Sequence, residues 1–191
     1  MRVACAYGKR SNSTAGAIRL YRYGGGAKTL ARGAFTSAAA CTGPDGRLWV
    51  AWGDRSDGVY VTRSNRAVAA FEPVQRLSLP RGTEGLTFLQ CEGSPGPLDL
   101  FADVVVGAAN GFWHTHLLPH FTLSAHAVKT KVTLSTRDAG DPLSGATIVV
   151  AGKHLKTDAK GQASLTLRPG SYSARAAAAG YAPAAARVTV R

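Results

Sequence analysis

The sequence has no long hydrophobic run. No stretch approaches the ~20 consecutive apolar residues that a membrane-spanning helix needs, so we expect no membrane span. Near the start, the polar segment GKRSNST at residues 8–14 lies where a secretory signal would need an apolar core of about 7–15 residues. We therefore expect no signal peptide within this chain.

Cysteine is also scarce. Cys5, Cys41 and Cys91 are the three cysteines, and no two of them have the CxxC spacing of a zinc site. One disulfide with one free thiol suits an oxidising compartment, whereas three thiols suit a reducing one. Composition alone leaves both open, and it predicts no metal and no cofactor.

Acidic residues are few, with 11 Asp and Glu against 23 Lys and Arg, a net charge of +12 at pH 7. Residues 1–120 hold 13 basic and 8 acidic residues, and residues 121–191 hold 10 and 3. The basic residues come singly or in pairs, not as the one-sided, aromatic-flanked patch of a nucleic-acid site. We expect no specific nucleic-acid partner, although a basic rim at Lys153, His154, Lys156 and Lys160 leaves weak attraction to polyanions open.

The N-terminal part of the chain contains an internal repeat. The segment CTGPDGRLWVAW at residues 41–52 aligns with CEGSPGPLDLFA at residues 91–102, fifty residues later. GVYVTRSN at residues 58–65 recurs as GFWHTHLL at residues 111–118. Short apolar strands between turns, repeating every ~50 residues, are typical of four-stranded propeller blades.

Residues 1–120 hold about two blades and the end of a third, whereas propellers typically use 4–8. The start within a blade favours further blades upstream, with completion by other copies or an irregular sheet as alternatives. Cys41 and Cys91 occupy equivalent positions on successive blades, which usually lie farther apart than the ~7 Å Cα limit of a disulfide. We expect two buried thiols there.

The phrases GPDGRLWVAW and VTRSN resemble those of bacterial sialidase-like propeller proteins, over about residues 1–118. The resemblance implies a fold, not an activity. The Asp-box pattern SxDxGxxW is incomplete at residues 56–60. Two blades also cannot supply the arginine cluster, the tyrosine–glutamate pair and the acid that sialidase catalysis needs.

From about Val128 the pattern becomes strand, turn, strand. PLSGATIVV, TDAKGQASLTL and PGSYSARA follow one another in an order that resembles the carboxypeptidase regulatory-like or PEGA-like sandwich, a prealbumin-like fold, over residues 128–191. The resemblance implies a non-catalytic accessory domain of secreted or cell-surface proteins, some of which bind glycans. Gly161 and Gly170 are expected at positive φ, and Asp158 is expected to start a turn.

Two groups of polar residues are candidates for a metal site or a catalytic site. His114 and His116 alternate on one predicted strand, where Asp99 or Asp103 would complete a metal site. Asp99 and Asp103 also resemble a catalytic carboxylate pair, and no GxSxG motif marks a nucleophile. Polar residues on blade strands are ordinarily solvated, so we expect neither a metal nor a catalytic site.

Aromatic residues at strand ends suit a binding face, because their rings stack on sugars or peptide side chains. Core packing is the alternative for each. The candidate binding residues are Trp49, Trp52, Tyr60, Arg63, Trp113 and Tyr181.

The sequence thus predicts an all-β protein: partial β-propeller blades at 1–120, a linker at 121–127, and a small prealbumin-like β-sandwich at 128–191. We expect a non-catalytic, secreted or cell-surface module that binds carbohydrate or protein. One alternative is the C-terminal fragment of a propeller-type glycoside hydrolase. Another is a structural or assembly protein, and a homo-oligomer that completes the propeller is left open.

Overall fold

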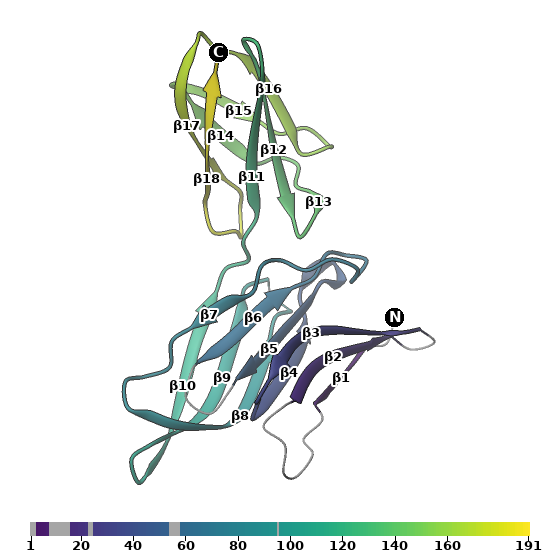
Figure 1. Ribbon diagram of the computed structural model, residues 1–191, viewed down its shortest axis with the longest axis vertical. Helices are drawn as coiled ribbons and strands as arrows, with labels where there is room; N and C mark the ends of the chain where they lie inside the picture. Colours follow the sequence, from purple (N-terminus) through teal and green to yellow (C-terminus); the bar gives the residue numbers. More distant parts are fainter. Residues whose placement is uncertain (1–2, 8–15, 23–24, 54–57, 95) are drawn as a thin grey trace. The chain divides into compact units, whose positions relative to one another are not determined.

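The computed structural model describes residues 3–7, 16–22, 25–53, 58–94 and 96–191 (Figure 1). In these ranges the chain forms strands in several sheets, none of them closed, and one 3-10 turn, Pro44–Gly46. The all-β prediction is confirmed. No helix of the described residues is long and apolar enough to cross a membrane. The Asp-box remnant at residues 56–60 lies partly outside the described residues.

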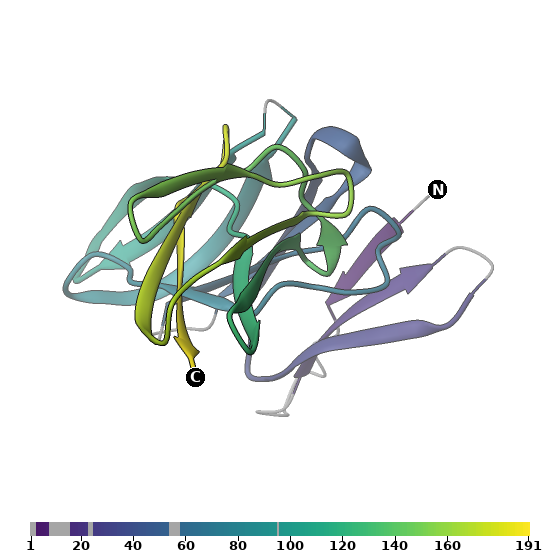
Figure 2. The same cartoon turned by 90° about the horizontal axis from the view of Figure 1, so that it is seen from above.

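The chain divides into two compact units, each built from strands and turns (Figures 1 and 2). The first unit comprises Met1–Arg63 and Pro73–Leu117, and the second comprises Ser64–Glu72 and Leu118–Arg191. The excursion at residues 64–72 belongs to the second unit, where the Arg66 amide donates to Asp141 Oδ2 at 3.0 Å.

Among the described residues, the first unit contains three antiparallel sheets. The strands of the first sheet are β1 (Val3–Tyr7), β2 (Gly16–Arg22) and β3 (Ala27–Gly33). The second has four: β4 (Ser37–Thr42), β5 (Leu48–Gly53), β6 (Val59–Arg63) and β7 (Gln75–Leu77). The third has β8 (Thr83–Glu92), β9 (Leu98–Val106) and β10 (Ala109–Leu117).

The burial of these strands follows their sequence patterns. In β9 the alternating residues Leu98, Leu100, Ala102 and Val104 are buried, and the residues between them face solvent to varying degrees. Strand β5, with the nearly continuous apolar run LWVAWG, is buried along its whole length. A strand covered on both faces needs no alternation, which is why β5 lacks it. Both strands contribute to one core cluster.

The two repeats fold alike but lie closer together than predicted. Strands β4, β5 and β6 are the sequence equivalents of β8, β9 and β10. Cys41 and Cys91 form a disulfide with their Cα atoms 5.8 Å apart, so the expectation of two thiols is wrong. The cause is the close approach of the β4 and β8 ends: a Cβ on Gly93 would lie 2.9 Å from Trp49 Cδ1 and 3.4 Å from the Thr42 carbonyl oxygen.

The second unit is a sandwich of two antiparallel sheets. One contains β11 (Thr122–Val128), β12 (Lys131–Asp138), β13 (Asp141–Pro142) and β16 (Gln162–Thr166). The other has the order β15 (Lys153–Lys156), β14 (Thr147–Val150), β17 (Gly170–Ala177) and β18 (Ala184–Val190). Most of the predicted linker, 121–127, is therefore part of strand β11, whose Leu123 belongs to the sandwich core.

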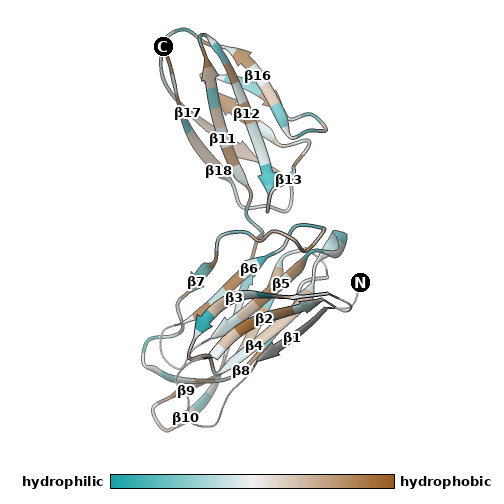
Figure 3. Ribbon diagram, turned by 45° about the vertical axis from the view of Figure 1, so that its right-hand side comes forward, coloured by the Kyte–Doolittle hydropathy of each residue, from teal (hydrophilic) through white to brown (hydrophobic). Residues whose placement is uncertain are grey.

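Alternating apolar residues of both sheets build that core, among them Val132, Leu134, Ile148, Val150 and Val188. Figure 3 shows hydrophobic residues along the strands of each unit and hydrophilic residues in many connecting turns.

The turn before β16 forms as the sequence predicts. Asp158 Oδ1 accepts hydrogen bonds from the Lys160 and Gln162 amides at 2.9 and 2.8 Å. Gly161 has φ of 70°, and a Cβ there would lie 2.5 Å from the Thr136 carbonyl oxygen, so only glycine fits. Gly170 also has a positive φ, of 153°. The positive φ expected at Gly161 and Gly170 is confirmed.

The disulfide is expected to stabilise the first unit. Its 50-residue separation corresponds to about 4 kcal/mol in the chain-entropy model of cross-linking. We predict that Cys91→Ser lowers the free energy of unfolding of this unit by an amount of that order, measured by urea titration. Unreduced, denatured wild-type protein should show one reactive thiol per chain, and three would contradict the bridge.

Candidate functional site

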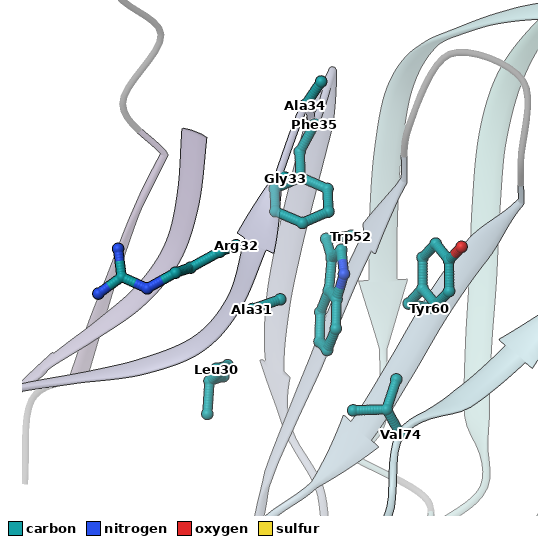
Figure 4. A pocket seen from close by; sticks show the side chains of 9 residues that line it. All are labelled: Leu30, Ala31, Arg32, Gly33, Ala34, Phe35, Trp52, Tyr60 and Val74. Carbon is teal, nitrogen blue, oxygen red and sulfur yellow. The ribbon is translucent and has the colours of Figure 1, made fainter. Parts of the chain in front are cut away.

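An aromatic cleft lies in the first unit (Figure 4). Its volume is about 360 Å³. The lining consists of residues 30–35, from the end of β3 and the turn after it, with Trp52, Tyr60 and Val74. Two of the six predicted binding residues, Trp52 and Tyr60, thus come together at one cleft.

The strand register sets the aromatic wall. Trp52 on β5 is the direct cross-strand partner of Tyr60 on β6, and their rings stack with centroids 6.1 Å apart and planes inclined by 15°. Phe35 meets Trp52 edge to face at 6.4 Å and 76°. The ring of Phe35 lies against Gly33, whose missing side chain leaves it room: a Cβ there would be 3.1 Å from Phe35 Cζ. Three rings therefore share one surface.

Apolar side chains dominate the cleft. Among the described residues, Arg32 is the one charged side chain that lines it, and Figure 4 shows its guanidinium directed away from the aromatic rings. Trp52 is only 2% exposed and serves as backing, whereas Tyr60 is half-buried and presents ring surface to the cleft. A concave apolar site with aromatic rings suits the flat faces of sugar rings or an apolar side chain.

Three other predicted binding residues belong to the core. Trp49 is fully buried, and Arg63, 4% exposed, places its guanidinium carbon 5.4 Å from the centre of the Trp49 ring. Trp113 is half-buried and packs against the same core cluster. Core packing, the alternative given for the aromatic residues, describes the positions of Trp49 and Trp113. The predicted strands were located correctly, but periodicity does not reveal that a second sheet covers Trp49.

Tyr181 lies in the second unit, at a corner of the sandwich. Its hydroxyl donates to Asp138 Oδ2 at 2.5 Å, and its ring meets Phe121 edge to face at 5.7 Å. Asp138 is fully buried. These contacts give Tyr181 a packing role.

The two histidines share one carboxylate. Asp99 Oδ1 lies 3.1 Å from both His114 Nε2 and His116 Nδ1. Hydrogen bonds from His116 and His114 lower the pKa of Asp99 below its usual value. Phe101, between Asp99 and Asp103 on the same face, stacks on His114 at 4.5 Å. Within the described ranges, no three His, Cys, Asp or Glu side chains form a group able to hold a metal ion.

Asp99 and Asp103 are four residues apart along one extended strand, which separates them by about 13 Å. Carboxylates that hydrolyse glycosides lie about 5–9.5 Å apart. The pair considered from the sequence therefore lacks the geometry for that chemistry.

Sequence reasoning missed Phe35 and Val74. They lie in the turn after β3 and in the segment before β7, outside the repeated phrases, so no repeat position marked them. Exposed phenylalanines at polar positions of an alternating strand, such as Phe101 in LDLFADVVV, were a readable signal for a surface.

Comparison with known families identifies part of the chain. Residues 127–191 match the model of the carboxypeptidase regulatory-like domain. Together with the two-sheet sandwich, this match confirms the predicted class of the C-terminal part. A search of curated proteins found no match to the chain.

Tyr181 is expected to stabilise the sandwich. Tyr181→Phe removes a hydrogen bond to a buried carboxylate, and we predict a loss of about 1.5–3 kcal/mol in the free energy of unfolding of the second unit. Tyr172→Phe is the matched control, because the Tyr172 hydroxyl donates to the exposed Arg168 carbonyl and should cost less than about 0.5 kcal/mol. Equal losses in the two variants would contradict the assignment.

The shared carboxylate gives a second prediction. Carboxyl-carbon NMR should show Asp99 titrating below its ordinary pKa of 3.8, and His116→Ala should raise that midpoint. Because the folded pKa is lowered, this contact stabilises the fold above the unfolded pKa and is lost as pH falls through the folded value. His120→Ala, which removes an exposed histidine outside the cluster, should leave the midpoint unchanged.

Proposed function

We propose that the protein is a non-catalytic binding module that holds a carbohydrate in the cleft formed by Phe35, Trp52 and Tyr60. The observation that carries the proposal is the stacked pair of Trp52 and Tyr60 at a concave, apolar surface. The ring of the half-buried Tyr60 can contact the C–H face of a sugar ring, with the buried Trp52 behind it.

The size and lining of the cleft favour a small ligand segment over a broad protein interface. Its volume of about 360 Å³ falls at the lower end of ligand pockets, typically ~300–1,000 Å³. Binding of a protein through one inserted apolar side chain is the alternative, and the experiment below includes it.

Two features support the proposed location and architecture of this module. The Cys41–Cys91 disulfide favours an oxidising compartment, which supports a secreted or cell-surface location. The four-stranded antiparallel order β4-β5-β6-β7 has the topology of a propeller blade, which supports the proposal that the repeats are successive blades. The regulatory-like sandwich would serve as the accessory domain.

The test is a glycan array probed with the full chain, followed by calorimetry on the strongest binder. We expect Tyr60→Ala to weaken binding about fivefold or more, since loss of a stacking ring costs on the order of 1 kcal/mol or above. The matched control is Tyr21→Ala, a partly exposed tyrosine of β2 outside the cleft, which should bind as the wild type does.

Thermal unfolding of both variants checks that the fold is intact. Wild-type binding by folded Tyr60→Ala would refute the cleft as the site. Failure of the wild type to bind any glycan, with retention of a protein partner that Tyr60→Ala loses, would favour the protein alternative.

A further inference from the structure

Basic residues are absent from one long part of this basic chain. Between Arg81 and Lys129 the sequence contains no Lys or Arg, and this interval includes all of β8, β9 and β10. The sheet that these strands form buries one side in the core of the first unit. Its other side faces solvent and carries acidic and aromatic residues.

We name this solvent side the acidic aromatic face and define it by Glu92, Asp99, Asp103, Phe88, Phe101 and Phe112. The register sets them in rows across the sheet, with Glu92 beside Asp99 and with Asp103 between Phe88 and Phe112. The three phenylalanines are 50%, 46% and 92% exposed. His114 and His116 complete the rows on β10.

Three exposed phenyl rings on one sheet face are unusual for a solvated surface. Covering them would remove apolar area from water, a favourable change of about 25 cal/mol per Å². The interleaved carboxylates select what can cover them, because an apolar or acidic partner would leave those charges desolvated or repelled. A positively charged surface with room for the rings meets both conditions.

Such a surface exists on the second unit. The outward side of the sheet β15-β14-β17-β18 carries Lys156, Arg175 and Arg187, which we name the basic face. The register places His154, Val149, Arg175 and Ala185 in one row across it. The remaining outward residues are small, including Thr147, Ser173 and Ala177, and none is acidic.

We propose that the acidic aromatic face of one copy of this chain docks on the basic face of a second copy. Arginine suits the contact because its planar guanidinium stacks on aromatic rings while bonding carboxylates. Beside its cations the basic face carries short side chains, including Ser173 and Ala177, and Phe88, Phe101 and Phe112 are exposed on the other face. The surfaces are different patches of one chain, so the contact is heterologous and can continue from copy to copy. This inference is independent of the cleft.

The net charge of +12 opposes association, so the contact depends on local complementarity. At physiological salt the Debye length is about 8 Å, which screens distant charges while contacting pairs still attract. The proposed contact joins one face of a three-stranded sheet to one face of a four-stranded sheet. The association is therefore expected to be weak, reversible and weakened further by high salt.

The test is sedimentation velocity of the full chain over a wide range of concentration. The wild type should rise above its monomer mass of 19.9 kDa as concentration increases, and return toward it at high salt. Asp103→Lys, which reverses a charge on the acidic aromatic face, and Arg175→Glu, which reverses one on the basic face, should each stay monomeric. Lys131→Glu, an exposed position on the opposite sheet, is the matched control and should associate as the wild type does.

Mixing the two monomeric variants gives the decisive result. Arg175→Glu keeps an intact acidic aromatic face and Asp103→Lys keeps an intact basic face, so the mixture should associate although neither variant does so alone. A wild type that stays monomeric at every concentration, or a mixture that does not associate, would overturn the proposal. So would association that Asp103→Lys abolishes and Arg175→Glu does not, because another surface would then be the partner.

Discussion

The close packing of two equivalent strand ends governs the architecture of the first unit. Gly43 and Gly93 lie so near each other that a Cβ on Gly43 would be 3.4 Å from the Gly93 carbonyl oxygen, and the indole of Trp49 fills the space beside both. The disulfide between Cys41 and Cys91 fixes the same point covalently. Since a side chain on Gly93 would meet that indole at 2.9 Å, the sheets can approach only where glycine recurs in both repeats.

This packing gives equivalent sequence positions opposite environments. Trp49 and Asp99 occupy the same place in the two repeats, yet Trp49 is fully buried and Asp99 is partly exposed beside two histidines. Strand β5 is covered on both faces, whereas β9 is covered on one. The first repeat thus supplies a buried aromatic wall that ends in the cleft at Trp52 and Tyr60, while the second supplies a polar and aromatic surface.

The sequence predicts local structure better than the environment of a face. Alternation located β9 and β12, and Asp158 with Gly161 located a turn, because these signals act within a few residues. Alternation shows which side chains share a face but not what covers it, so the burial of Trp49 and Arg63 escaped prediction. The disulfide was not predicted for the same reason. It depends on the distance between two sheets, and the spacing expected of successive propeller blades placed Cys41 and Cys91 too far apart.

The carboxylates of the third sheet limit which surfaces can cover its exposed phenylalanines. Phe88, Phe101 and Phe112 alone would favour association with any apolar surface, including the same face of another copy. Glu92, Asp99 and Asp103 alternate with them in the register, so two such faces brought together would oppose like charges. Because a neutral surface would remove these carboxylates from water without offering them an opposite charge, and an acidic one would repel them, the acids disfavour neutral and acidic partners. The same residues that keep this face soluble therefore restrict it to a basic surface.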